Sequence, residues 1–344
     1  MPGKRIRVGV IGYGGTFDMA KVHLGEMRKA GMSPVAVADI DLERLSVARR
    51  DFPGIRTYPS ARDLLQDSEL DLVTIVTPHD THARLALQCL RAGKHVVCEK
   101  PMAITTAECD AMIRAARERK LLLSTYHNRH WDGWILNAMK LIRAGRIGDV
   151  VRVDGYMGQW AKPGDWWRSS KSISGGILYD WGVHLLEYTL QMVDSSIVEV
   201  SGYARGGVWA KGNAWNKDTI EDEGFIVVRY ASGAWSTLLV TALDAAPRAG
   251  WFHVTGTRGT LEFDSQGWKL TTVPDAGRGA PVTATLSGRN PDSEWWRFYK
   301  NIAAHLTRGE KLAITPEWAR RPIHIIDLAY QSAARGAAVK AKYP

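Results

Sequence analysis

The chain has 344 residues, 45% hydrophobic and 24% charged, which is enough for two compact domains. Its net charge is +9, but basic residues are mixed with acidic ones, so we expect an anionic cofactor or substrate and no nucleic acid. No apolar run is long enough to span a membrane and no signal peptide is evident, which predicts a cytoplasmic protein without a membrane partner. The three cysteines lack the spacing of a disulfide framework or a zinc site, so no metal is expected.

The first 128 residues alternate short apolar runs with helical patterns. Apolar runs predict strands at 6–11, 35–38, 72–76, 95–98 and 121–125. Helical patterns occupy 41–52, 81–92 and 105–120. Because βα units repeat, we predict an α/β domain with a doubly wound parallel sheet over residues 1–128.

Residues 129–344 have a different pattern and are predicted to form a second domain. Longer alternating strands at 151–156, 224–230, 234–242 and 251–255 indicate an α+β domain with one large, mainly antiparallel open sheet. Helical stretches at 134–144, 178–192, 293–307 and 316–335 are expected to cover one face of that sheet, and 274–288 to form an exposed loop. All 14 tryptophans lie at or beyond Trp131, which separates the two halves by composition as well.

A glycine-rich turn follows the first predicted strand. Gly12, Gly14 and Gly15 let the backbone approach a pyrophosphate, although Phe17 stands where the third glycine of the dinucleotide fingerprint is expected. The second strand ends at Asp39, 27 residues after Gly12, where a carboxylate can bind both ribose hydroxyls and repel a 2′-phosphate. This favours NAD over NADP. The alternative is that Asp39 only caps the next helix.

Two more predicted strands end in polar residues. After 72–76 come Thr77 and Pro78, and here His79 or His82 either approaches a cofactor or belongs to an ordinary helix start. After 95–98 comes the sequence Glu-Lys-Pro, which places Lys100 at the carboxyl end of a buried strand. Lys100 is therefore a site candidate, and a surface lysine is its alternative.

The second half holds one further candidate pair and many aromatic residues. Asp180 and His184 are four residues apart in a helical stretch, so their side chains share a face. This arrangement is typical of a general base and the carboxylate that orients it. The alternative is an ordinary pair on the helix surface. The tryptophans present flat apolar faces that suit sugar rings, or they pack in a core or a subunit interface.

In order along the chain, these motifs resemble the family of glucose-fructose oxidoreductase, inositol dehydrogenase and the rhizopine-catabolism protein MocA. The resemblance covers essentially the whole chain, and its most specific parts are Glu-Lys-Pro and the Asp-x-x-x-His helix. It implies a Rossmann domain, an oligomer-forming sheet domain, a nicotinamide dinucleotide and a sugar, polyol or related substrate.

The motifs and the resemblance together assign roles to individual residues. The predicted catalytic residues are Lys100, Asp180 and His184. The predicted cofactor-binding residues are Gly12, Tyr13, Gly14, Gly15, Thr16, Phe17, Asp39, Ile40, Thr77, Pro78, His79, His82, Glu99, Lys100, Pro101, Asn128, Trp167 and Arg168. The predicted substrate-binding residues are Lys100, Asn128, Arg129, Trp160, Asp180 and His184.

Three functions are compatible with these assignments. The leading hypothesis is an NAD-dependent dehydrogenase of a sugar, polyol or sugar acid, with Arg129 or Arg168 as the anchor of an acidic group. The second is a redox-neutral enzyme that recycles bound NAD during glycoside elimination or epimerisation. The third is a non-catalytic regulator, against which the intact catalytic residues argue. In the first two, His184 is the base and Lys100 stabilises the alkoxide, or these roles are exchanged.

A sheet with one uncovered face also predicts a homodimer or homotetramer.

Overall fold

The protein is described here by a computed structural model that covers residues 5–15, 18–273 and 283–341. Two compact units divide the chain. The first contains Met1–Asn128 and Trp296–Arg320, and the second contains Arg129–Trp295 and Arg321–Pro344. The sequence-based division also changed domain at residue 128, but it left 296–320 in the second domain, and the structure differs there.

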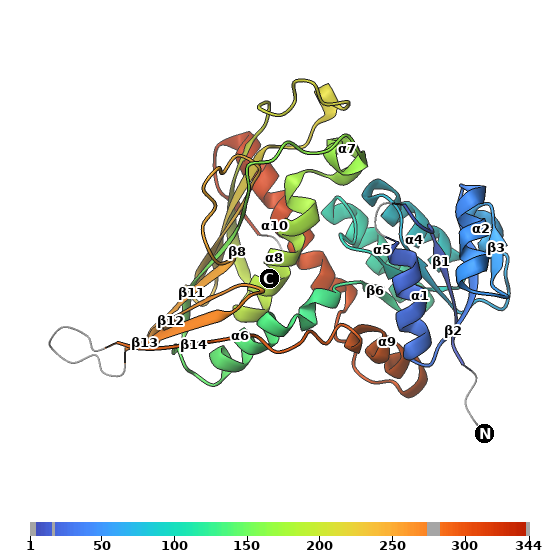
Figure 1. Ribbon diagram of the computed structural model, residues 1–344, viewed down its shortest axis with the longest axis horizontal. Coiled ribbons are helices and arrows are strands. Elements are labelled where there is room, and N and C mark those ends of the chain that lie inside the picture. Colours follow the sequence, from blue (N-terminus) through green and yellow to red (C-terminus); the bar gives the residue numbers. More distant parts are fainter. Residues whose placement is uncertain (1–4, 16–17, 274–282, 342–344) are drawn as a thin grey trace. The chain divides into compact units, whose positions relative to one another are not determined.

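The first unit is built on a parallel sheet of six described strands in the order β3-β2-β1-β4-β5-β6 (Figure 1). The strands are β1 (Arg7–Ile11), β2 (Ser33–Ala38), β3 (Arg56–Tyr58), β4 (Leu72–Ile75), β5 (His95–Cys98) and β6 (Leu123–Thr125). The helices are α1 (Met19–Lys29), α2 (Leu42–Asp51), α3 (Ala61–Leu65), α4 (His82–Arg91), α5 (Thr106–Arg119) and α9 (Arg297–Arg308). The predicted doubly wound sheet is confirmed, and sequence analysis missed only the short, half-buried β3 among its strands.

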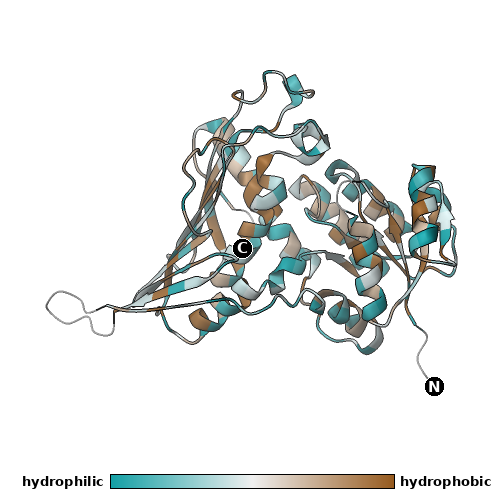
Figure 2. Ribbon diagram, in the orientation of Figure 1, coloured by the Kyte–Doolittle hydropathy of each residue, from teal (hydrophilic) through white to brown (hydrophobic). Residues whose placement is uncertain are grey.

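Hydrophobic residues concentrate on the central strands of this sheet, whereas the outer helix α2 is mostly hydrophilic (Figure 2). All four residues of β4 are buried, as expected of a parallel strand covered on both faces. In open α/β sheets, ligands bind in the crevice at the carboxyl ends of such strands.

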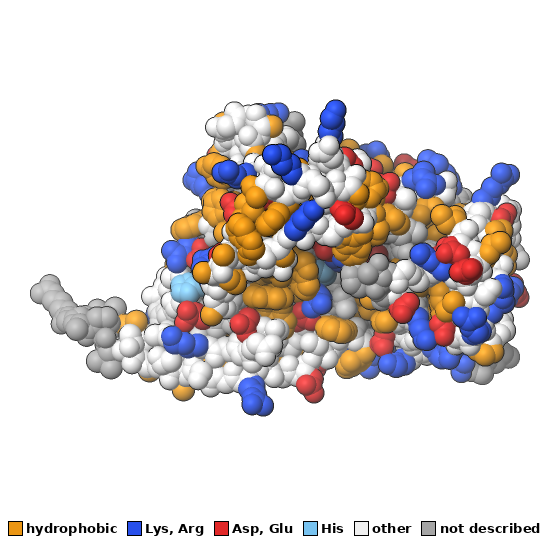
Figure 3. Space-filling view, turned by 45° about the horizontal axis from the view of Figure 1, so that its top comes forward, with side chains coloured by type: hydrophobic (Ala, Val, Ile, Leu, Met, Phe, Trp, Pro, Cys, Tyr) orange, Lys and Arg blue, Asp and Glu red, His pale blue; other side chains and the backbone are white. Residues whose placement is uncertain are grey.

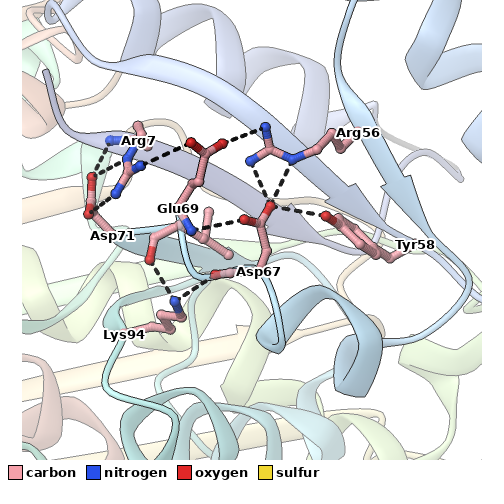
Figure 4. A network of polar contacts seen from close by, with 8 residues as sticks. Arg7, Arg56, Tyr58, Asp67, Glu69, Asp71 and Lys94 are labelled. Atoms are coloured by element: carbon pink, nitrogen blue, oxygen red, sulfur yellow. Dashed lines mark hydrogen bonds and ion pairs between the residues drawn. The ribbon is translucent and has the colours of Figure 1, made fainter.

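A polar network closes the opposite, amino-terminal edge of the sheet (Figure 4). Asp67 accepts hydrogen bonds from the Arg56 guanidinium at 2.6 and 2.9 Å and from the Tyr58 hydroxyl at 3.0 Å. The Lys94 ammonium donates to the carbonyl oxygens of Asp67 and Leu70, both at 2.8 Å. These bonds join the segments that precede β4 and β5 to β3, so this edge serves stability.

The segment Trp296–Arg320 completes the first unit. Phe298 and Tyr299 of α9 pack against Tyr126, with ring centroids 4.9 and 5.6 Å apart, and the Ser124 hydroxyl donates to the carbonyl oxygen of Ile314 at 2.8 Å. The prediction that the helix at 293–307 covers the second sheet is therefore wrong, because its aromatic face is buried beside β6 instead.

The second unit contains a sheet of nine described strands in the order β14-β13-β12-β11-β7-β10-β9-β8-β15. Its strands are β7 (Val150–Gly158), β8 (Ile197–Arg205), β9 (Glu223–Tyr230), β10 (Trp235–Thr241), β11 (Phe252–Gly256), β12 (Gly259–Phe263), β13 (Trp268–Thr272), β14 (Ala284–Gly288) and β15 (Val339–Lys340). Only β7 and β10 pair in parallel among them, so the mainly antiparallel sheet is confirmed. The predicted loop at 274–288 is wrong at its end, where β14 forms an exposed strand, and 274–282 lies outside the described residues.

Three helices pack on one face of this sheet: α6 (Gly133–Arg143), α8 (Val183–Met192) and the part of α10 (Pro316–Arg335) that belongs to this unit, which lies against Gly202 of β8. Side chains alternate along β10 accordingly, with Leu238 and Val240 buried under the helices and Leu239 partly exposed on the other face. On that other face Tyr203 and Trp235 are 66% and 36% exposed. The uncovered face is thus accessible in the single chain, and it carries aromatic side chains beside charged pairs such as Arg152–Asp154 and Arg229–Glu199.

Across the described ranges, no helix combines the length and the hydropathy needed to cross a membrane. On the face drawn in Figure 3, basic side chains are interspersed with acidic ones. The cytoplasmic location expected from the sequence stays a prediction.

Candidate active site

The glycine turn after β1 has the backbone geometry that only glycine allows. Gly12 has φ +92°, and a Cβ atom at this position would lie 2.1 Å from the carbonyl oxygen of Val76. Tyr13 contributes its backbone here, because its side chain is buried and its hydroxyl donates to Asp51 at 2.7 Å. Gly14 and Gly15 also have positive φ angles, whereas Thr16 and Phe17 lie outside the described residues.

Asp39 at the end of β2 braces this turn. Its two carboxylate oxygens accept the backbone N–H groups of Tyr13 at 2.6 Å and of Asp41 at 2.8 Å. The capping alternative does not hold, because Asp41 is the residue that caps α2 and accepts from the Glu43 amide at 2.9 Å. The next residue, Ile40, is 92% exposed. An isoleucine this accessible beside a strand end offers an apolar surface for a flat ring.

The strand order reverses between β1 and β4, which is where open α/β sheets bind their ligands. The turn after β4 is held by hydroxyls, since Thr81 donates to the carbonyl oxygen of Pro78 at 2.7 Å and accepts from Thr77 at 2.6 Å. The residues at these strand ends fit a dinucleotide: a turn that a Cβ atom would obstruct, a carboxylate at the end of β2 and a crevice at the point of reversal.

His82 connects two of these strand ends. Its ring is fully buried, with Nδ1 2.8 Å from the carbonyl oxygen of Pro101 and Nε2 2.9 Å from that of Thr77. Burial is the main cause that lowers its pKa. His82 therefore contacts the loops after β4 and β5 through its two ring nitrogens, of which the neutral imidazole donates a hydrogen bond to one carbonyl oxygen. The neighbouring His79 is also buried.

Glu99 is fixed by a buried chain of hydrogen bonds that sequence analysis did not find. Its carboxylate lies 3.0 Å from His23 Nε2 and accepts the Lys100 amide at 2.9 Å. His23 Nδ1 lies 2.7 Å from the Tyr299 hydroxyl, which lies 3.2 Å from the Thr74 hydroxyl. Burial alone would raise the pKa of Glu99, but the His23 and Lys100 contacts lower it. Glu99 thus supports the backbone of Lys100, whose own side chain is half-buried.

The boundary between the two units passes through the predicted site. Lys100 and Asn128 belong to the first unit, whereas Arg129, Asp180 and His184 belong to the second. Each half of the predicted site therefore belongs to a different unit.

The second half begins with an irregular helix. Residues Leu178–Gly182 form a π-helical turn that continues into α8, so Asp180 and His184 lie on either side of a change in helix type. Two glycines precede it, and a Cβ atom at Gly176 would lie 2.6 Å from Oε2 of Glu221. π-helical turns of this kind are frequent at functional sites.

Asp180 is bound by an arginine that was expected to contact the cofactor. Arg168 Nη1 donates to both carboxylate oxygens of Asp180 at 3.0 Å, and its guanidinium lies 5.1 Å from the rings of Trp166 and Trp167. His184 is buried, and its ring centroid lies 5.5 Å from that of Trp181. Asp180 is therefore held as a charge-paired carboxylate.

Arg129 is engaged in a similar way. Its guanidinium lies 4.9 Å from the Trp181 ring and 5.6 Å from the Trp295 ring, and Nη1 donates to Asp132 at 3.4 Å. These contacts anchor the segment that follows the unit boundary.

A cavity of about 570 Å³ lies wholly within the second unit. Its aromatic lining residues are Tyr156, Trp166, Trp181 and Trp251. Its charged lining residues are Lys162, Arg168, Asp180 and Arg248. Trp160, a predicted substrate residue, is not among the described residues that line it. Its ring is 57% exposed and packs 5.3 Å from that of Trp209.

The first unit defines a class of protein: a doubly wound sheet with a glycine turn after β1 and an acidic end to β2 is a dinucleotide-binding Rossmann fold. Comparison with known families agrees. Residues 6–127 match the oxidoreductase family with an NAD-binding Rossmann fold named GFO/IDH/MocA, and residues 135–262 match the C-terminal domain of the same family. The chain belongs to the Gfo/Idh/MocA family of oxidoreductases, which confirms the resemblance seen in its motifs.

Individual relatives are similar over the whole length. The scyllo-inositol 2-dehydrogenase (NADP(+)) of Bacillus subtilis is 27% identical, with 95% of this chain and 93% of the relative aligned. The myo-inositol 2-dehydrogenase of Thermotoga maritima is 26% identical, with 91% of each chain aligned. Among solved structures, an NAD-binding protein from Listeria innocua superposes with a TM-score of 0.83 at 27% identity, covering 98% of this chain and 97% of that one.

Proposed function

We propose that this protein is an NAD-dependent dehydrogenase that oxidises a secondary hydroxyl of a sugar, a polyol or a sugar derivative. The observation that carries the proposal is the cavity of the second unit, where aromatic faces and the Asp180 carboxylate line one space. Aromatic rings suit the apolar faces of a sugar ring, and a carboxylate accepts hydrogen bonds from its hydroxyls. The full-length relatives that are inositol dehydrogenases support the same chemistry.

The preference for NAD over NADP rests on Asp39. Each of its oxygens accepts one backbone N–H, which leaves further lone pairs for two ribose hydroxyls and a negative charge that repels a 2′-phosphate. The Bacillus subtilis relative uses NADP(+), so the preference needs a direct test. We expect Asp39→Ser to lower the kcat/KM ratio for NAD over NADP by about tenfold or more.

The proposed chemistry assigns a task to each catalytic residue. When bound, the nicotinamide supplies the acceptor for a hydride. His184 takes the hydroxyl proton, and the Lys100 ammonium stabilises the negative charge that develops on the same oxygen. Asp180, paired with Arg168, hydrogen-bonds the substrate. The Arg168 pairing makes Asp180 a positioning and binding group in this proposal.

The test is absorbance at 340 nm while the purified protein is offered NAD or NADP with a panel of monosaccharides, polyols, sugar acids and glycosides. Reduction of NAD with one substrate class supports the proposal. In single-turnover experiments, His184→Asn should slow the hydride step by about a hundredfold or more. An unchanged step would remove His184 from the role of base, and conversion of a substrate without net NADH would replace the proposal by a redox-neutral reaction.

We also propose that the chain forms a homodimer or homotetramer through the uncovered face of the nine-stranded sheet. Tyr203 and Trp235 are exposed there, and Phe225 and Leu239 lie on the same face. An accessible sheet face that combines aromatic residues with charged pairs such as Arg229–Glu199 is suited to contact with a second copy. Light scattering that gives the mass of a single 38.2 kDa chain would contradict this.

A further inference from the structure

We infer that the cavity of the second unit recognises an anionic group on its substrate and that Arg248 is the anchor of that group. The inference rests on the proposed function and narrows it: the substrate is a sugar or polyol derivative that carries a carboxylate or a phosphate. Neither the resemblance nor the motifs of the sequence single out Arg248, which lies in the loop between β10 and β11.

Arg248 is held in place by its own loop. Its guanidinium carbon lies 4.1 Å from the centroid of the Tyr156 ring, and its backbone N–H donates to the Tyr156 hydroxyl at 3.3 Å. That hydroxyl donates to Asp244 at 2.5 Å. Two residues of the loop, Asp244 and Arg248, are therefore both held to Tyr156 of β7. A guanidinium stacked on a ring uses its face, and its N–H edges are then available in one plane.

Among the described residues, no side chain forms a hydrogen bond with those edges. Within the part of the chain that the structure describes, no carboxylate lies within 4.0 Å of the Arg248 guanidinium and no acceptor is hydrogen-bonded to it. Asp244, the acidic residue of the same loop, accepts a hydrogen bond from the Tyr156 hydroxyl, which is the main cause that lowers its pKa, and the nearby charge of Arg248 lowers that pKa further. A fixed guanidinium that lines a cavity and makes no direct ion pair with a described carboxylate is suited to bidentate recognition of a carboxylate or a phosphate.

The other two arginines considered for this task are already engaged. Arg168 is neutralised by Asp180, and Arg129 donates to Asp132 and stacks on tryptophans. The inference therefore gives the anchoring of an acidic group to Arg248, whereas the sequence had suggested Arg129 or Arg168. Arg248 is the remaining arginine among the described residues that line the cavity.

Lys162 adds a second positive charge to the same cavity. Its loop is joined to the Arg248 loop, because Ala161 N–H donates to the carbonyl oxygen of Ala242 at 3.2 Å. Lys162 donates to a carbonyl oxygen, that of Gly212 at 2.8 Å, which leaves its charge unneutralised. With Asp180 balanced by Arg168, the described lining has a net formal charge of +2 from Lys162 and Arg248. That excess favours an anionic ligand over a neutral one of the same shape.

Isothermal titration calorimetry of the full-length protein, saturated with NADH, tests the inference separately from catalysis. The probes are the aldonates, uronates and 6-phosphates of glucose, galactose and mannose, together with the neutral parent sugars and myo-inositol. We expect at least one anion to bind about tenfold or more tightly than its neutral parent. Comparing the carboxylates with the 6-phosphates shows which anion the cavity prefers.

Three variants assign the effect. Arg248→Gln should remove the preference for the anion and leave binding of the neutral parent unchanged, and Arg248→Lys should restore part of it. Arg205→Gln, which changes an exposed arginine of β8 outside the cavity lining, is the matched control and should behave as wild type. Equal binding of anions and neutral sugars, equal loss of both in Arg248→Gln, or no binding of any anion would overturn the inference. Oxidation of neutral sugars without anion preference would refute only the inference, whereas tight Arg248-dependent binding of an anion that is never oxidised would refute only the proposed function.

Discussion

Replacing Tyr299 by Phe tests the buried chain of hydrogen bonds that supports the Lys100 loop. The ring stays, so its packing against Tyr126 at 5.6 Å and Phe298 at 5.1 Å is kept and no cavity forms. The hydroxyl is lost, and with it the contacts to His23 at 2.7 Å and Thr74 at 3.2 Å. Both partners are fully buried and cannot turn to water.

A buried polar group left without its partner costs about 1–3 kcal/mol. Two such groups lose a partner here, but Thr74 keeps a 3.8 Å contact with the sulfur of Met27. We therefore expect Tyr299→Phe to destabilise the first unit by about 3 kcal/mol.

Hydrogen–deuterium exchange measured by mass spectrometry is the suitable assay, because it reports on each unit by its own peptides. Peptides from α1 and β5 should exchange faster in Tyr299→Phe, while those from β9 and β10 should not change. The control is Tyr203→Phe, which removes a hydroxyl from a side chain that is 66% exposed. If α1 and β5 exchange equally in Tyr299→Phe, Tyr203→Phe and wild type, the buried chain does not stabilise the unit as argued.

Two more predictions concern the two edges of the parallel sheet. Gly12→Ala should destabilise the first unit by about 3 kcal/mol, because the added Cβ would lie 2.1 Å from a carbonyl oxygen. Fluorescence titration should then show no binding of NADH. The control is Gly25→Ala in α1, which should be tolerated because its Cβ meets no atom within 4 Å. At the other edge, burial alone would raise the pKa of Asp67, but its hydrogen bonds with Arg56, the Glu69 amide and Tyr58 lower it below the ordinary value. Because the folded pKa is the lower one, the stabilisation is present above the unfolded pKa of about 3.9 and is lost as the pH falls through the folded value. Asp67→Asn should cost about 2 kcal/mol in urea unfolding at pH 7 and progressively less below pH 4, and a difference that does not depend on pH would contradict this.

The sequence predicted the parallel sheet because its strands are buried on both faces and read as continuous apolar runs, as in β4 and β5. It also predicted the strand ends, since polar residues interrupt those runs where the crevice opens. The pattern could not say where α9 packs. Its apolar residues Phe298 and Tyr299 show that one face is buried, but not against which sheet.

The second half of the site shows another limit. The four-residue spacing of Asp180 and His184 is the same in an α-helix and in a helix that begins with a π-helical turn, so the sequence did not reveal the change of helix type. The pairing of Asp180 with Arg168 depends on how the intervening glycines turn the chain. Arg248 was missed because its proposed role rests on the Tyr156 ring that its guanidinium contacts and on its place in the cavity lining, and spacing in the sequence shows neither.

The division of the chain has a consequence for its synthesis on the ribosome. The six strands of the parallel sheet are all made by residue 125, yet the first unit lacks Trp296–Arg320, including Tyr299 beside His23, until most of the chain has emerged. The second unit in turn waits for the residues after Arg320. The nascent amino-terminal segment therefore waits with the α9 site on Tyr126 uncovered while residues 129–295 are made, and both units complete their cores only once α10 has emerged.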